Sequence, residues 1–147
     1  MCNKILWASL LAVALVLGGC GSSGTLTSNN INGNWTATLT NSDGSLAYQF
    51  SATFAQGSGS ELSITNLTYT ASSACPALTS EGQVQGSFAV ATGAFAMTQT
   101  LLNVGGPILS LQGKAGNGRI SGQWTLSGLV PRCSGNGSFT ISPMTAT

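Results

Sequence analysis

Few side chains in this sequence could carry out acid–base or nucleophilic chemistry. The 147 residues include no histidine, three acidic residues and four basic residues. Histidine is the commonest general base and metal ligand, so its absence removes the usual routes to catalysis and to metal binding. Asp43, Glu61 and Glu81 could supply an acid–base pair of the kind that hydrolyses glycosides, but their spacing does not require one. We therefore assign no catalytic residue and expect no enzyme, no cofactor and no metal.

Serine is abundant, but no residue is placed to activate it. Ser110 precedes Lys114 by one position too many for the Ser-x-x-Lys pattern of a serine–lysine dyad. Lys114 and Arg119 flank Gly116–Gly118, which predicts a positively charged hairpin tip exposed to solvent. The formal net charge is only +1, with 5% of the residues charged. A surface with so little positive charge excludes nucleic acid as an expected partner.

The N-terminus has the organisation of a secretory signal. Lys4 is followed by a mostly apolar run over residues 5–17 and then by small residues ahead of Cys20. As a helix the apolar run would be about 20 Å long, whereas the hydrocarbon core of a bilayer is about 30 Å thick. The sequence therefore favours a cleaved signal peptide over residues 1–19 rather than a permanent transmembrane helix.

The segment Leu17-Gly18-Gly19-Cys20 resembles the lipobox of bacterial lipoproteins, in which an apolar residue and two small residues precede a cysteine. The resemblance implies that Cys20 receives a diacylglyceryl group and becomes the mature N-terminus, so that acyl chains anchor the protein to a membrane. Gly21, in place of aspartate, resembles the pattern of lipoproteins sent to the outer membrane. The alternative is an ordinary secreted protein, cleaved near Gly19, that keeps Cys20 as a thiol.

The lipobox resemblance leaves Cys75 and Cys133 in the exported domain, because Cys2 is removed with the signal and Cys20 carries lipid. A pair of cysteines in an oxidising compartment is most simply a disulfide. Such a bond would stabilise the fold by about 4 kcal/mol on chain-entropy grounds. A redox pair and a metal site are the alternatives, although neither cysteine lies in a Cys-x-x-Cys motif.

Residues 20–30, which begin with the lipidated cysteine, are predicted to form a flexible tether, and residues 31–147 a folded β-barrel domain. The tether is small, polar and uncharged. The domain shows alternation of apolar and polar residues in about eight short runs, separated by turn residues. Leu67 and Tyr69 continue one run out of phase, which predicts a β-bulge near Thr65 or Asn66. The clearest alternation places five apolar side chains on one face: Leu46, Tyr48, Phe50, Ala52 and Phe54.

Eight short strands joined by tight turns predict an all-β fold, an antiparallel meander closed as an up-and-down β-barrel, with a β-sandwich as the alternative. A single flat sheet would leave its apolar face in water, so the sheet has to close or fold over. A Gly-x-aromatic unit recurs, which we interpret as glycine allowing a strand to coil while the aromatic ring covers the same face. Its five copies begin at Gly33, Gly86, Gly93, Gly122 and Gly137.

Two of these units carry a family resemblance. Gly33-Asn34-Trp35 resembles the Gly-x-Trp opening of lipocalins, and Gly122-Gln123-Trp124-Thr125 is similar to the strand starts of avidin-type barrels. Both families are eight-stranded up-and-down β-barrels, and the resemblance implies a small ligand in the barrel mouth. The aromatic side chains that would line either such a site or a filled core are Trp35, Tyr48, Phe50, Phe88 and Trp124.

These observations lead to two hypotheses. The first is a non-enzymatic, lipid-anchored protein of the bacterial envelope, exported to the outer membrane, whose barrel binds a small apolar or amphipathic ligand. The second is a structural or interaction module of the envelope with a filled core and no small-molecule ligand. An interior cavity of about 300 Å³ or more would favour the first hypothesis.

Overall fold

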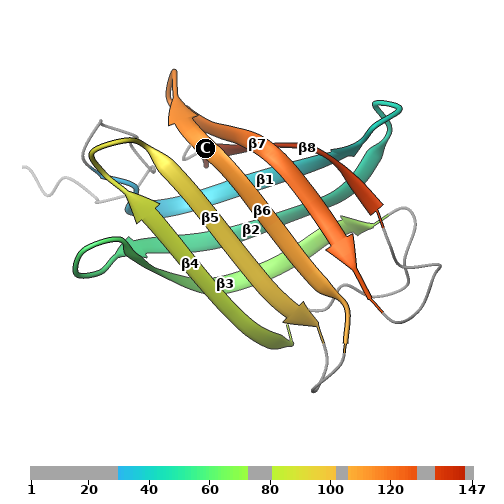
Figure 1. Cartoon of the computed structure of the whole chain (residues 1–147), viewed down its shortest axis with the longest axis horizontal. Helices are drawn as coiled ribbons and strands as arrows, with labels where there is room; N and C mark the ends of the chain where they lie inside the picture. The colour runs from blue at the N-terminus through green and yellow to red at the C-terminus, as the bar shows by residue number, and fades with distance from the viewer. Residues whose placement is uncertain (1–29, 73–80, 102–105, 129–134, 145–147) are drawn as a thin grey trace, which may run out of the picture.

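Eight antiparallel strands form a closed barrel in chain order (Figure 1). The computed structural model describes residues 30–72, 81–101, 106–128 and 135–144. Each strand pairs with the next along the chain, and β8 pairs with β1 to close the sheet. This confirms the predicted up-and-down barrel over the β-sandwich. The strands are β1 (Gly33–Asn41), β2 (Leu46–Gln56), β3 (Glu61–Ser72), β4 (Gly82–Ala89), β5 (Ala94–Leu101), β6 (Ile108–Gly116), β7 (Arg119–Ser127) and β8 (Gly135–Pro143).

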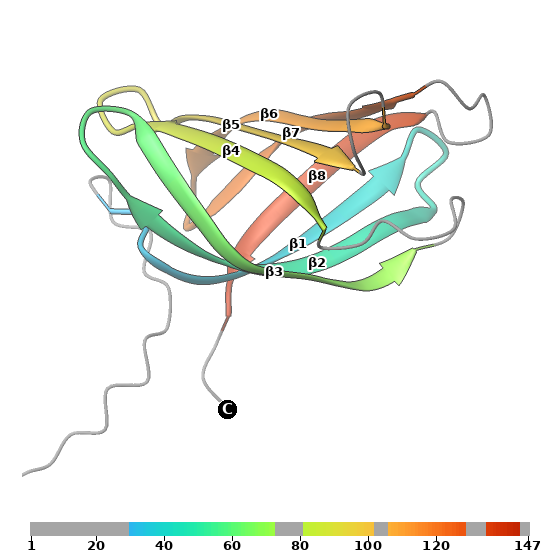
Figure 2. The same ribbon diagram turned by 90° about the horizontal axis from the view of Figure 1, so that it is seen from below.

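The barrel has two distinct ends. The start of β1, the end of β8 and the β2–β3, β4–β5 and β6–β7 turns lie at one end, which we call the N-terminal end. The β1–β2 turn lies at the opposite end, where β3, β5 and β7 finish. Figure 2 shows the β2–β3 and β4–β5 turns on the left and the β1–β2 turn on the right. Within the described residues, no helix is long and apolar enough to cross a membrane.

The alternating pattern directs one face of every strand into the barrel. Trp35, Ala37 and Leu39 on β1 are each no more than 1% exposed, and the residues between them are more exposed. Burial of such apolar area is the main force that stabilises a closed sheet. The remaining buried apolar residues are Ile31, Ala47, Tyr48, Phe50, Ala52, Phe54, Leu62, Leu67, Phe88, Phe95, Met97, Leu109, Leu111, Ile120, Trp124, Leu126, Phe139 and Ile141.

Register shifts on both sides of β2 interrupt its regular pairing, one toward β1 and two toward β3. The β2–β3 register shifts beside Asn66, which has a left-handed backbone (φ 52°), so the predicted β-bulge is confirmed. The register shift toward β1 lies between Leu39 and Thr40, opposite the start of β2. Ala47 is buried there and Leu46 is 42% exposed. The prediction that Leu46 shares the inner face of β2 is therefore wrong, because the shift moves it outward.

Close approach of β6, β7 and β8 depends on glycine. Gly113, Gly122 and Phe139 lie opposite one another on the three strands. A Cβ added at Gly113 would lie 2.8 Å from Cζ of Phe139, and one added at Gly122 would overlap the carbonyl oxygen of Gln112. The ring of Phe139 meets that of Phe95 at 6.1 Å between centroids. The two glycines therefore provide the space that these rings occupy.

Glycines on β8 make room for Trp124 in the same way. Added Cβ atoms at Gly135 and Gly137 would lie 3.0 Å and 2.9 Å from the Trp124 indole. The Trp124 Nε1–H donates a hydrogen bond of 2.8 Å to the carbonyl oxygen of Thr40. The ring that covers Gly137 thus comes from β7, and not from the aromatic residue two positions along its own strand, Phe139.

The β3–β4 interface is the weakest part of the ladder. Only Glu61 and Leu62 of β3 find register partners on β4, at Ser87 and Gly86. The two strands then diverge toward the opposite end of the barrel (Figure 2). A Cβ at Gly86 would lie 2.7 Å from Cδ1 of Ile64, so an isoleucine side chain covers the glycine where the pairing ends.

We predict that Gly122→Ala destabilises the barrel by roughly 2 to 3 kcal/mol, because the new methyl group collides with the β6 backbone rather than with a movable side chain. Urea denaturation of the purified protein measures the change. Gly116→Ala is the matched control, because a Cβ there meets open space, and it should change stability by less than about 0.5 kcal/mol. Equal effects of the two substitutions would contradict the proposal that the absence of a side chain at Gly122 lets β6 and β7 approach each other.

Candidate functional site

The five aromatic residues proposed to line a ligand site or a core all lie in the barrel interior. Trp35, Tyr48, Phe50, Phe88 and Trp124 are each 1% or 2% exposed. Tyr48 and Trp124 meet edge to face, with centroids 5.7 Å apart. Trp35 stacks on Phe54, and Phe50 meets Tyr69 edge to face with centroids 5.5 Å apart, all within one hydrophobic core. These rings are packed as core residues, and a ligand-binding role for them stays a prediction.

The polar atoms of the two tryptophans are already used inside the fold. Trp35 Nε1–H donates a hydrogen bond of 2.8 Å to the carbonyl oxygen of Ile31, and its ring stacks on Phe54 at 6.0 Å. Trp124 Nε1–H is bonded to the Thr40 carbonyl oxygen. Buried indoles normally find such a partner. Both rings thereby fix backbone positions and leave no indole N–H for a ligand.

A buried polar pair, Tyr69 and Gln99, spans the interior near the β3–β4 divergence. The Tyr69 hydroxyl donates a hydrogen bond of 2.6 Å to Oε1 of Gln99, which is completely buried. Burial, with a smaller effect of Tyr48, raises the pKa of Tyr69, and burial also raises the pKa of Tyr48. Both hydroxyls therefore stay protonated at neutral pH, so neither tyrosine offers a base.

Gln99 was not among the residues predicted from the sequence to lie in the barrel interior. The available signal was its place in the alternation of β5, where Phe95, Met97 and Gln99 share the inner face. A polar residue on an inner face requires a hydrogen-bonding partner. Its partner Tyr69 lies on a strand that is not adjacent to β5, so only the closed barrel brings the two side chains together.

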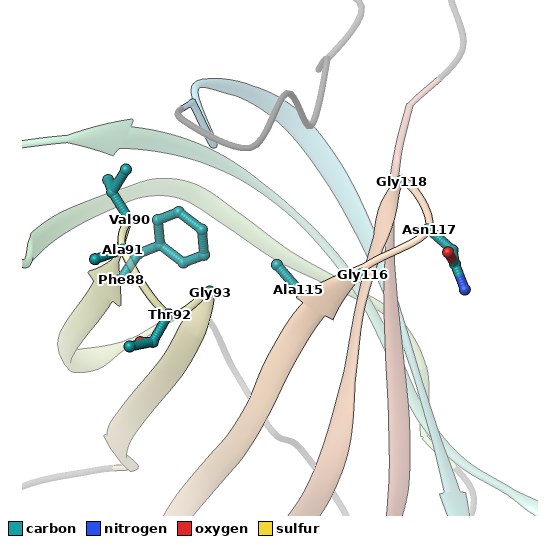
Figure 3. Close-up of a pocket in the computed structure, with 9 residues that line it drawn as sticks. All are labelled: Phe88, Val90, Ala91, Thr92, Gly93, Ala115, Gly116, Asn117 and Gly118. Atoms are coloured by element: carbon teal, nitrogen blue, oxygen red, sulfur yellow. The ribbon is translucent and has the colours of Figure 1, made fainter.

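A half-open hollow of about 340 Å³ lies at the N-terminal end, between the β4–β5 and β6–β7 turns (Figure 3). We call it the rim pocket. Figure 3 shows the Phe88 ring pointing toward the β6–β7 hairpin and the Ala115 methyl group pointing back toward it. Two more open hollows lie on the outer face of β4–β6. The rim pocket is lined by Phe88, Val90, Ala91, Thr92, Gly93, Ala115, Gly116, Asn117 and Gly118.

The turns beside the rim pocket are fixed by backbone geometry. Asn117 and Gly118 both have positive φ, at 53° and 74°, which is the arrangement of a tight two-residue hairpin and confirms the predicted turn. Gly93 also has a positive φ of 70°. The Ala115 N–H donates a 2.8 Å hydrogen bond to the Gly93 carbonyl oxygen and so links the two turns. The pocket walls are therefore set by the fold and carry no charged side chain.

One polar side chain ties the β2–β3 turn to β4 at the N-terminal end. Gln56 Nε2 donates hydrogen bonds of 3.2 to 3.3 Å to the carbonyl oxygens of Gly59, Glu61 and Phe88. Its Oε1 is buried and has no partner within the described residues. The Gln56 side chain thus connects the β2–β3 turn to β4 beside Phe88, while its own Oε1 stays without a hydrogen bond within the described residues.

The three carboxylates do not gather into a site. Asp43 lies in the β1–β2 turn and Glu81 precedes β4, both at the opposite end, whereas Glu61 begins β3 at the N-terminal end. Hydrogen bonds from the Ser45 hydroxyl and amide hold the pKa of Asp43 below its usual value, as expected for turn chemistry. No cluster of three or more possible metal ligands is found in the part of the chain that the structure describes.

The cysteines predicted to carry lipid and a disulfide, Cys20, Cys75 and Cys133, lie outside the described residues.

Comparison with protein-family models, with curated proteins and with solved structures finds no match for this chain. The class that the structure itself defines is a closed, eight-stranded, antiparallel up-and-down β-barrel, which is consistent with the lipocalin-like architecture that Gly33-Asn34-Trp35 implied.

We predict that Tyr69→Phe destabilises the protein by about 1 to 2 kcal/mol, because the buried Gln99 Oε1 loses the Tyr69 donor. Tyr48→Phe is the matched control, since no hydrogen bond of the Tyr48 hydroxyl is found within the described residues, and it should cost less. Thermal or urea unfolding of both variants measures the difference. A larger loss for Tyr48→Phe would show that the Tyr69–Gln99 hydrogen bond does not stabilise the barrel.

Proposed function

We propose that this chain is a lipid-anchored, non-enzymatic protein of the bacterial envelope whose barrel binds a small apolar or amphipathic ligand. The observation that carries the binding role is the rim pocket, a hollow of about 340 Å³ that is more enclosed than the hollow of equal volume on the outer face of β4–β6. Its walls are uncharged: Phe88, Val90 and Ala115 supply apolar atoms, whereas the Asn117 amide points away from the Phe88 ring (Figure 3). Such a lining suits a neutral or weakly amphipathic molecule.

The anchoring role is supported by the N-terminal sequence. Residues 1–19 read as a signal peptide, and Cys20 stands where the lipobox resemblance implies attachment of a diacylglyceryl group. Acyl chains bind a membrane because each buried methylene contributes about 0.8 kcal/mol. Gly21 after the cysteine supports the outer membrane as the destination.

A disulfide between Cys75 and Cys133 belongs to the same proposal. The connections that contain them join β3 to β4 and β7 to β8. Both connections begin and end at the opposite end of the barrel, so the strand order supports the pairing. An exported protein would form the bond in an oxidising compartment.

A second candidate function is a structural or interaction module whose interior is filled by its own side chains. The observation that favours it is the packing of the predicted ligand residues against core neighbours. Trp35 stacks on Phe54, Phe54 meets Phe95 at 5.9 Å, and Phe95 meets Phe139. In that case the rim pocket would be a surface depression without a ligand.

We predict that the protein incorporates radioactive palmitate during growth and that Cys20→Ala abolishes the label. The acyl chains have no other proposed attachment site, so the loss should be complete. Cys2→Ala is the control and should keep the label, because Cys2 belongs to the cleaved signal. Label that persists in Cys20→Ala would overturn the anchoring proposal.

An intact-mass measurement of the same protein tests the disulfide, because reduction adds two hydrogens to an oxidised pair.

We predict that Ala115→Phe weakens binding of the neutral probe N-phenyl-1-naphthylamine by about tenfold or more, because the new ring occupies the rim pocket between Ala115 and Phe88. A fluorescence titration measures the dissociation constant. Ala55→Phe is the matched control, since Ala55 is exposed on β2 and is not among the pocket residues. If the wild type does not bind the probe, or if Ala115→Phe binds it as well as the wild type, the structural module is favoured.

A further inference from the structure

The β6–β7 hairpin carries a small cluster of positive charge at the N-terminal end. Lys114 and Arg119 are exposed, and their register positions, opposite Ser121 and Gly116, place both on the outer face of the hairpin. Diagonal neighbours of this kind lie about 7 to 8 Å apart. No ion pair neutralises either side chain within the described residues. The same hairpin forms one wall of the rim pocket.

The remaining charges are distributed unequally between the two ends. Asp43 and Glu81 lie at the opposite end of the barrel. Glu61 is the one described acidic residue at the N-terminal end, and it lies at the start of β3, away from the β6–β7 hairpin in the strand order. Arg132 lies outside the described residues. Among the described side chains, the N-terminal end therefore has the more positive charge.

The polypeptide also enters the barrel at this end, through a well-fixed segment. Ile31 is completely buried and its carbonyl oxygen accepts the hydrogen bond from Trp35 Nε1. Asn32 Oδ1 accepts a 2.6 Å hydrogen bond from the backbone N–H of Gln56. The stretch between Cys20 and Asn30 would span about 17 Å as a flexible coil. A lipid on Cys20 would thus hold the N-terminal end close to the membrane.

We propose that the N-terminal end of the barrel docks on anionic lipid headgroups through Lys114 and Arg119, so that the rim pocket faces the membrane and takes its ligand from there. This inference rests on the proposed lipid anchor. An anionic bilayer attracts each basic residue near its surface, so Lys114 and Arg119 by themselves favour the docked orientation about thirtyfold, and repulsion of Glu61 at the same end lowers that factor. The tether keeps the barrel within reach, and the hairpin charges set its orientation.

The test uses the full-length, lipidated, ¹⁵N-labelled protein in nanodiscs that contain a lipid with a spin label on its headgroup. The spin label attenuates the amide signals of residues that approach the membrane. In discs with phosphatidylglycerol we expect Gly93 and Asn117 to be attenuated more than Gly44, which lies in the β1–β2 turn at the opposite end. In discs of phosphatidylcholine alone the tether still holds the N-terminal end nearer to the lipid, so the difference should persist but be clearly smaller.

The double variant Lys114→Gln/Arg119→Gln should reduce the difference in anionic discs to the value found in phosphatidylcholine discs. Glu61→Gln is the matched control and should preserve or increase it, because it removes negative charge from the same end. Equal attenuation of Asn117 and Gly44 in the wild type overturns the docking, as does a difference in anionic discs that the double variant leaves unchanged. Failure of the lipid anchor is read separately, as protein that does not associate with neutral discs, and it overturns both proposals.

Discussion

The close approach of neighbouring strands at glycine is the constraint on which the rest of the barrel depends: β6 meets β7 at Gly113 and Gly122, and β8 meets β1 at Gly137. Each glycine faces a backbone carbonyl or an aromatic ring that a Cβ would strike. With the strands this close, Phe139 lies over the Gly113–Gly122 pair and Trp124 lies over Gly137. A glycine leaves empty the space that a side chain would occupy inside the barrel. Because the interior is close-packed, an aromatic ring from a neighbouring strand fills that space.

This way of filling the barrel decides where a ligand could bind. The rings of Trp35, Phe54, Phe95 and Phe139 form a continuous series of contacts through the interior. A ligand at those positions would have to displace packed aromatic area, which costs more than entering a hollow that already exists. The rim pocket lies beside this series, since its lining residue Phe88 is the register partner of Phe95, and its walls are two turns of glycines and short residues. Ligand binding and a tightly packed core are therefore compatible in one barrel.

Local sequence patterns predicted the strands better than they predicted the site. Alternation identified the inner face of β2 from Tyr48 to Phe54, and its change of phase at Leu67 and Tyr69 located the bulge at Asn66. The Asn-Gly signal located the Asn117–Gly118 hairpin. The outward turn of Leu46 was missed, because it follows from a register shift between two strands. The Tyr69–Gln99 hydrogen bond was missed for the same kind of reason, since it joins strands that are neither consecutive nor paired.

Scarcity of charge makes the position of each charged residue matter more. Cleavage before Cys20 would remove Lys4 and leave three basic residues, Lys114, Arg119 and Arg132, against three acidic residues. A protein with no net charge has little electrostatic repulsion to keep its copies apart, and a lipid anchor limits their encounters by holding each copy at a surface. On such a protein no general attraction or repulsion by the membrane competes with a local pair of charges. Two unneutralised basic residues on one hairpin can then determine which end of a tethered barrel meets an anionic bilayer.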